Sequence, residues 1–431
     1  MKKIILAVFA TLLAISGIFV CSCSKKQPTN TIMLWHWMTD RHETIKKLAA
    51  QYTQETGVIV NVELFAPSDA YSQKITAAAQ ANVLPDIYGI LDKKGILAEF
   101  IKAGFVADLT ADFIANDREW EKSLFEKAVA PNRFEEGNSY GIKAGVYGVP
   151  IDVTNMQMLY NKKLLAKAGI MSPPKTFDEF LKASDALKRT GTPTFVSGWG
   201  ELWLADCFAS NYAFNIFGEQ KVLDTFLGKV PYTDPGWIKV FDVFRILRDR
   251  GALVEGIVTK GNKYAEQDFA LERAAFTFNG SWAVNVYKDM NPNLEYGVMP
   301  PPPISSDFPL KIWGGAGSSF LVNQNSTNKD KAIAFLRWFS KKEQQAVLAK
   351  ETNNLPANRY AMDLIPPVLE EFSKGMEQST HPTIWPVNED PLVIEAFDKG
   401  IQAIIIGEKT PVQVAQDVQV VKQRQNARPK R

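Results

Sequence analysis

Apolar and polar positions near the start of the chain alternate in two distinct periods. Alternation with a period of two predicts strands over 32–37 and 57–65, and a short apolar run predicts a buried strand within 84–91. Between them, apolar residues recur every three to four positions over 43–56 and 71–81, which predicts helices. Strands that alternate with helices pair in parallel through crossover connections, so this part of the chain is expected to form an α/β lobe.

The pattern continues in a second block, with the segment "PPKTFDEFLKASDALKR" predicting a helix capped by Thr176. A further helix is expected in "DPGWIKVFDVFRILRDRG", which ends at Gly251, and one long amphipathic helix in "NKDKAIAFLRWFSKKEQQAVL". Four consecutive prolines, 300–303, exclude helix and central strand and predict a stiff connection between lobes.

The length of the chain predicts its number of domains, and its N-terminus predicts a secretory signal. A chain of 431 residues is too long for one ordinary domain, so two are expected. Residues 1–22 carry two lysines and then an apolar run, the layout of a secretory signal. The following "VCSC" resembles a bacterial lipobox in which Cys23 is lipidated, with residues 23–31 as a tether. An ordinary signal peptide, a retained anchor and lipidation of Cys21 remain open alternatives.

Charge and cysteine content narrow the function classes. The chain has 49 Lys+Arg and 47 Asp+Glu, and removing Lys2 and Lys3 with the signal leaves equal numbers of each. A neutral mature protein is not expected to bind nucleic acid. Cys207 alone would remain in the mature part, which excludes an internal disulfide and favours a buried free thiol.

Several stretches together resemble one family. "LPDIYGILDKKGILAEFIKAGFVADLT", "YGVPIDVTNMQMLYNKKLLAKAGIMSPPKTFDEF", "AAFTFNGSWAV" and "NSTNKDKAIAFLRWFSKKEQQ" occur in this order. The ordered set is similar to the extracellular solute-binding proteins of ABC importers, of the maltose-binding, sugar-binding class. The resemblance covers nearly the whole mature chain, and a lipid-anchored, exported chain agrees with it.

The resemblance implies a two-lobed α/β periplasmic binding protein fold of type II, with discontinuous lobes and a hinge. The N-terminal lobe would comprise residues 32–153 and 301–353, and the C-terminal lobe residues 154–300 and 354–431. The chain would cross near Val153 to Asn155, again near Pro300 and again near Asn353. A monomer without cofactors is expected, held at the membrane by its anchor, facing the periplasm or the cell exterior, and working with the permease subunits.

A sugar site needs flat aromatic faces for the C–H surfaces and planar polar groups for the hydroxyls. Trp282 is the first candidate because a Trp in the matching Gly-x-Trp segment of the family stacks on the sugar. The alternative for Trp282 is burial by the following helix. Other tryptophans expected at turns or strand ends near the ligand are Trp37, Trp203, Trp313 and Trp385.

The candidate acids and glycines carry their own alternatives. Asp40 and Asp92 match acids that contact sugar hydroxyls in the family, but Asp40 could instead cap a helix and Asp92 lie on a solvated turn. Asp152 is expected as ligand contact or hinge residue, and Glu201 as a contact from the other lobe. Gly314 and Gly315 would let the backbone approach a ligand closely.

Other chemistries have little support. The histidines are His36, His42 and His381, and they form no HExxH-like pair, so no metal site is expected. The segment "GWGEL" is not the G-x-S-x-G nucleophile elbow of serine hydrolases, so the sequence does not support a serine hydrolase. An exported glycoside hydrolase would also be rich in aromatic residues and carboxylates. A phosphate ester such as glycerol phosphate would require Arg side chains or helix N-termini, and the proposed cleft segments contain no Arg cluster. Capture of a neutral carbohydrate is therefore the favoured hypothesis, with no catalytic residues.

Overall fold

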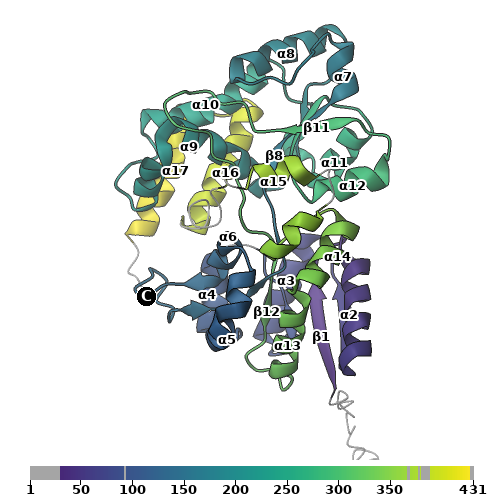
Figure 1. Cartoon of the computed structure of the whole chain (residues 1–431). Helices are drawn as coiled ribbons and strands as arrows, with labels where there is room; N and C mark the ends of the chain where they lie inside the picture. The colour runs from purple at the N-terminus through teal and green to yellow at the C-terminus, as the bar shows by residue number, and fades with distance from the viewer. Residues whose placement is uncertain (1–29, 92–93, 366–368, 377–378, 380–388, 428–431) are drawn as a thin grey trace, which may run out of the picture.

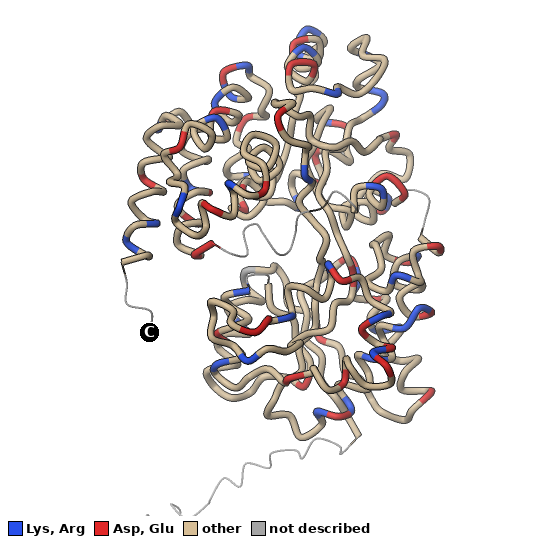
Figure 2. Tube along the Cα trace, turned by 60° about the vertical axis from the view of Figure 1, so that its left-hand side comes forward, with Lys and Arg blue, Asp and Glu red and all other residues tan. Residues whose placement is uncertain are grey.

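The computed structural model describes residues 30–91, 94–365, 369–376, 379 and 389–427. Two lobes, each built on its own sheet, lie one above the other in Figure 1. Lysines and arginines are interspersed with acidic residues over both lobes (Figure 2). Among the described residues, the helices are too short or too polar to cross a bilayer. The predicted signal, the lipidation site at Cys23 and the predicted tether up to residue 29 lie outside the described residues. Thr31, the last residue of the predicted tether, instead begins strand β1 (Thr31–His36).

The first lobe contains a five-stranded sheet in the order β2-β1-β3-β12-β6. Strand β1 is parallel to both β2 and β3, which confirms the predicted α/β arrangement. Strand β12 then pairs antiparallel with β3 and β6. The bounds are β1 (Thr31–His36), β2 (Ile59–Leu64), β3 (Ile87–Tyr88), β6 (Val149–Pro150) and β12 (Ser319–Val322).

Helices pack on both faces of this sheet because each buries one apolar stripe. In α2, the buried side chains include the predicted Ile45, Leu48 and Tyr52. The helices are α2 (His42–Thr56), α3 (Ser68–Gln80), α4 (Lys94–Lys102), α5 (Thr110–Ser123), α6 (Glu126–Val129), η1 (Ala130–Asn132), α13 (Lys329–Phe339), α14 (Lys342–Thr352) and η3 (Arg359–Leu364). A small ribbon joins β4 (Arg133–Phe134) to β5 (Gly145–Val146).

The single long helix predicted over 328–348 is wrong, because the chain breaks it between α13 and α14. At the break, the Ser340 hydroxyl accepts a hydrogen bond from Trp120 Nε1 (2.7 Å) and donates to the Arg337 carbonyl (3.1 Å). The Ser340 carbonyl accepts from Asn358 Nδ2 at 2.9 Å. The bond to Asn358 gives the Ser340 carbonyl a partner outside the helical ladder, and both Trp120 and Asn358 are remote from Ser340 in sequence.

The second lobe contains a four-stranded sheet in the order β11-β8-β10-β9. Its strands are β8 (Met156–Asn161), β9 (Phe195–Val196), β10 (Phe276–Gly280) and β11 (Tyr296–Met299). The surrounding helices are α7 (Lys162–Lys167), α8 (Phe177–Arg189), α9 (Leu202–Phe226), α10 (Pro235–Asp249), η2 (Ile257–Thr259), α11 (Asn262–Ala270), α12 (Ala283–Met290), α15 (Glu370–Lys374), α16 (Pro391–Ile405) and α17 (Pro411–Asn426). The predicted cap of α8 is confirmed: Thr176 Oγ1 accepts from the Glu179 amide at 3.2 Å.

Three chain segments run side by side between the lobes. Strand β7 (Asp152–Val153) pairs antiparallel with β13 (Leu355–Pro356). The third segment, 313–318, contacts the first through an antiparallel bridge between Asn155 and Gly314. Both lobes are therefore assembled from separate stretches of the chain.

Two of the crossings come later than the positions expected at Pro300 and Asn353. The Pro303 carbonyl accepts from the Phe177 amide (3.0 Å), so the chain after the prolines still lies against α8 of the second lobe. After β13, the Arg359 guanidinium donates to the Leu124 carbonyl (2.9 Å), which keeps this stretch on the first lobe. A proline run excludes regular structure without indicating which lobe it packs against.

Candidate functional site

Trp282 lies between strand β10 and helix α12, at the N-cap position of the helix. Its ring is half-buried and covers Gly280, where a Cβ would come within 2.0 Å of the ring. Phe276 and Phe278 beneath it are fully buried. The ring centroid of Trp203, at the start of α9, lies 6.0 Å away with the planes tilted by 48°. The two indoles form one aromatic surface at the edge of the second lobe.

Glu201 fixes the position of Trp203. One carboxylate oxygen accepts from Trp203 Nε1 (3.2 Å) and the other from the Asn262 backbone amide (2.7 Å). Glu201, predicted as a ligand contact, therefore also joins the start of α9 to the start of α11. Its contact with a ligand stays a prediction.

A buried polar cluster behind the indoles was missed by the sequence analysis. Asn262 Nδ2 donates to Glu266 Oε1 (2.9 Å), and Asn279 Nδ2 donates to Asn262 Oδ1 (3.2 Å). Burial raises the pKa of Glu266, and the charge of Asp40 acts in the same direction across the lobes. The i, i+4 spacing of Asn262 and Glu266 and the position of Asn279 at a strand end were available signals.

The first lobe contributes Trp37 and Asp40 after strand β1. The half-buried Trp37 ring lies 5.2 Å from the ring of Tyr71 and covers Gly89. Asp40 Oδ2 accepts from Arg41 Nε (3.1 Å) and from Asn354 Nδ2 (3.3 Å). The alternative that Asp40 caps helix α2 is wrong, because Arg41 occupies the N-cap position.

Asp152 lies at the centre of the three connecting segments. Its carboxylate accepts from Arg41 Nη1 and from the Ser318 amide (2.5 Å). Arg41 Nη2 also donates to Asn354 Oδ1 at 3.0 Å. Burial raises the pKa of Asp152, while the Arg41 charge opposes that rise. These contacts favour the hinge alternative for Asp152, and sequence alone did not identify Arg41.

Trp313, Gly314 and Gly315 belong to the connecting segment 313–318. Trp313 is buried, and its carbonyl accepts from the Met156 amide at 2.8 Å. A Cβ on Gly314 would lie 2.4 Å from the Asn155 Cα, and the Gly315 amide donates to the Thr154 carbonyl (2.8 Å). The close backbone approach expected at these glycines thus occurs against the neighbouring connection. Asp92 and Trp385 lie outside the described residues.

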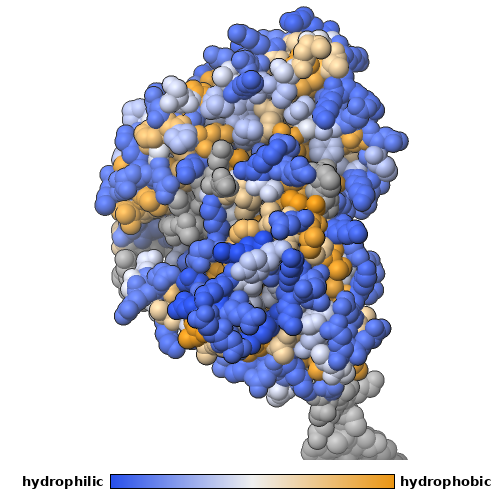
Figure 3. All heavy atoms as spheres, viewed as in Figure 1, coloured by the Kyte–Doolittle hydropathy of each residue, from blue (hydrophilic) through white to orange (hydrophobic). Residues whose placement is uncertain are grey.

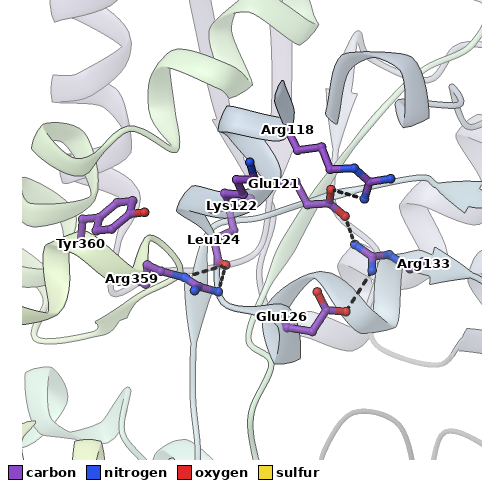
Figure 4. Close-up of a pocket in the computed structure, with 8 residues that line it drawn as sticks. All are labelled: Arg118, Glu121, Lys122, Leu124, Glu126, Arg133, Arg359 and Tyr360. Carbon is purple, nitrogen blue, oxygen red and sulfur yellow. Dashed lines mark hydrogen bonds and ion pairs between the residues drawn. The ribbon is translucent and has the colours of Figure 1, made fainter. Parts of the chain in front are cut away.

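Apolar side chains gather at the level where the lobes meet on the face shown in Figure 3. A pocket of about 480 Å³ lies elsewhere, on the first lobe, and is drawn in Figure 4. Its acids bind its own cations: Glu121 pairs with Arg118 (3.0 Å) and with Arg133 (2.5 Å), and Glu126 with Arg133 (3.0 Å). This pocket offers no tryptophan face. Within the described ranges, no group of three or more His, Cys, Asp or Glu side chains could hold a metal ion.

The sequences of known proteins align with most of this chain. The melibiose/raffinose/stachyose-binding protein MelE of Bacillus subtilis is 24% identical over 362 residues, covering 79% of this chain and 78% of that protein. A maltooligosaccharide ABC transporter solute-binding lipoprotein of Streptococcus pneumoniae is 24% identical over 335 residues, covering 74% of this chain and 70% of that protein.

The fold is also that of solved binding proteins. A chitin oligosaccharide binding protein superposes with a TM-score of 0.79 at 22% identity, over 92% of this chain and 99% of its own. Maltose-bound MalE3 of T. maritima gives a TM-score of 0.77 at 19% identity, over 92% and 99%. These structures confirm the two-lobed, maltose-binding-like architecture. A sequence model described as bacterial extracellular solute-binding protein matches residues 47–371, and the chain belongs to that family.

Proposed function

We propose that this protein captures a neutral carbohydrate between its lobes and delivers it to the transmembrane subunits of an ABC importer. The observation that carries this proposal is the half-buried pair of indoles, Trp203 and Trp282, at the edge of the second lobe. Rigid aromatic faces of this kind suit the C–H surfaces of a sugar. Residues 37–41 connect β1 to α2 in the first lobe and are called the Asp40 loop. A hydrogen bond from Asn285 Nδ2 to the Asp40 carbonyl (3.3 Å) brings this loop next to α12.

The ligands printed in the names of the relatives agree with this proposal. MelE is named for melibiose, raffinose and stachyose, and the pneumococcal protein for maltooligosaccharides. The polar groups beside the indoles are mostly carboxylates and amides, which suit hydroxyls. Arg41, the cation beside Asp40, is already bonded to two carboxylates, so it is not available to a phosphate ester.

A thermal-shift screen over mono- and oligosaccharides tests the proposal. A ligand present at 100 times its dissociation constant should stabilise the protein by about 2.7 kcal/mol. Chromatography of the incubated sugar should show no cleavage products, since binding requires no general acid. Shifts that occur only with phosphate esters and fade with salt would favour the phosphate-ester alternative, and cleavage products would favour a hydrolase.

The same proposal places the protein at the outer face of the membrane through a lipid on Cys23. Substituting Cys23→Ala should release the protein from the membrane fraction, because the acyl chains on this residue provide the anchor. The matched control Cys21→Ala should leave it membrane-bound. The reverse pattern would assign the lipid to Cys21, and retention of both variants would indicate an uncleaved anchor.

A further inference from the structure

Asn285, in the first turn of α12, makes side-chain hydrogen bonds that join the second lobe to the first. Its Nδ2 donates to the Asp40 carbonyl (3.3 Å), and its Oδ1 accepts from Asn353 Nδ2 (3.1 Å). The orientation of the amide follows from its partners, because a backbone carbonyl can only accept. Asn285 is buried, with 8% of its surface exposed, so loss of these partners would leave buried polar atoms unsatisfied.

Both partners of Asn285 belong to the first lobe. Asn353 ends helix α14 in the left-handed region, with φ 48° and ψ 45°. The next residue, Asn354, donates to Asp40 Oδ2 (3.3 Å) and accepts from Arg41 Nη2 (3.0 Å). Arg41 in turn binds Asp152 on strand β7. The contact of Asn285 therefore continues, through hydrogen bonds, to the hinge.

The start of α12 is fixed to the hinge independently. The Ser281 hydroxyl lies 2.9 Å from the Thr154 hydroxyl, and the Ser281 amide donates to the Asn155 carbonyl (3.0 Å). Trp282 follows Ser281 and precedes Asn285 by three residues, so it lies between the two attachments. Ser281 attaches the residue before the helix N-cap to the hinge, and Asn285 attaches the first turn of the helix to the Asp40 loop.

We infer that Asn285 is a positioning residue of the solute site. It holds Trp282 of the second lobe at a fixed position relative to the Asp40 loop of the first lobe. It acts through these two residues and need not contact the solute. The inference rests on the proposed function in assigning Trp282 and Asp40 to the ligand. The inter-lobe bonds themselves are independent of that assignment.

The primary test measures the distance between the lobes without any ligand. Spin labels are attached to cysteines at Lys102 on the first lobe and Met171 on the second, both exposed, in the full-length protein. The Asn285→Ala variant should broaden the distance distribution. Asn353→Gly should do the same, since glycine keeps the left-handed backbone while removing the amide. The double variant should broaden it no further than Asn285→Ala alone, because that variant already removes the bond to Asn353.

The matched control is Asn291→Ala at the other end of α12. Asn291 Nδ2 donates to the Ala270 carbonyl (2.8 Å), and both residues belong to the second lobe. This variant should lower the melting temperature and leave the distance distribution unchanged. An Asn285→Ala protein that behaves like Asn291→Ala, less stable but with an unaltered distribution, would overturn the inference.

A second readout uses raffinose and maltotriose as probes in calorimetric titrations. Asn285→Ala should weaken binding at least threefold, because it removes both inter-lobe hydrogen bonds and one lost hydrogen bond is expected to weaken binding about threefold to tenfold. Asn285→Asp keeps the acceptor for Asn353 but loses the donor to Asp40, and it should also weaken binding. Unchanged affinity in Asn285→Ala would contradict a positioning role. If neither sugar binds the unsubstituted protein, the proposed function is in question, while the ligand-free distances still test Asn285.

Discussion

Trp282 shows what a single residue reveals in sequence and what it does not. A ring placed after a strand end, beside Gly280, pointed to either a ligand platform or the core. The half-buried ring, over fully buried Phe276 and Phe278, is compatible with a platform that also packs. Arg41 and Asn262 were missed because their roles depend on partners distant in sequence, such as Asp152 and Glu201.

Substituting Trp282→Ala should weaken sugar binding at least tenfold, because it removes the aromatic face. The loss of unfolding free energy should be smaller than the 3–5 kcal/mol that is typical of a buried Trp, since part of the ring is exposed. Calorimetric titration and urea denaturation measure the two effects. The control is Trp35→Ala, which removes another half-buried indole, packed on Phe65, and should not change affinity. A large stability loss with unchanged affinity would assign Trp282 to the core.

His36 makes stability depend on pH. It is fully buried: its Nδ1 accepts from the Met38 amide (3.2 Å), and its Nε2 lies 3.1 Å from His42 Nδ1. Burial, followed by the charges of His42 and Arg41, lowers the pKa of His36 from 6.5 to about 3. Between these values the unfolded chain binds a proton that the folded protein does not, so stability falls on acidification through this range.

Urea unfolding at pH 6.5 and pH 5.0 tests this account. Below about pH 6 the contribution of His36 should approach 1.4 kcal/mol per pH unit. His36→Asn keeps an acceptor for the Met38 amide but cannot titrate, so its stability should fall less over the same interval. Equal pH dependence in the two proteins would show that His36 does not bear this effect.

At the scale of elements, periodicity predicted what local residues determine. The strands and helices from β1 to β3 and the Thr176 cap of α8 follow from side chains within a few positions. The break at Ser340 could not be predicted because Trp120 and Asn358, which bind it, are remote in sequence. The glycines after Trp313 were recognised as sites of close approach, but the element they approach is set by the tertiary fold.

Gly314→Ala tests the packing of the connecting segments. Its φ of 147° costs a non-glycine residue about 1–3 kcal/mol, and the added Cβ would also clash with Asn155. Gly104→Ala is the control, because Gly104 has φ 77° but no atom within 4 Å of its Cβ position. Thermal and urea unfolding should show the larger loss for Gly314→Ala. Equal losses in both variants would mean that the clash with Asn155 is relieved at no cost.

At the scale of the whole molecule, the order of motifs predicted the two-lobed fold, and the solved relatives confirm it. The crossing points were harder to place. The stretch after Pro303 lies on the second lobe and Arg359 lies on the first. In both cases the contacts are made with residues distant in sequence, so no local pattern predicts them. The proposed site depends on this assembly, since Asp40 and Trp282 come from different lobes.

A crystal structure with the sugar that gives the largest thermal shift tests the central claim most directly. The account predicts that the sugar lies between the lobes, stacked on Trp203 and Trp282 and hydrogen-bonded to groups of the Asp40 loop. A sugar bound elsewhere, for example in the pocket between Arg118 and Arg359, would contradict it.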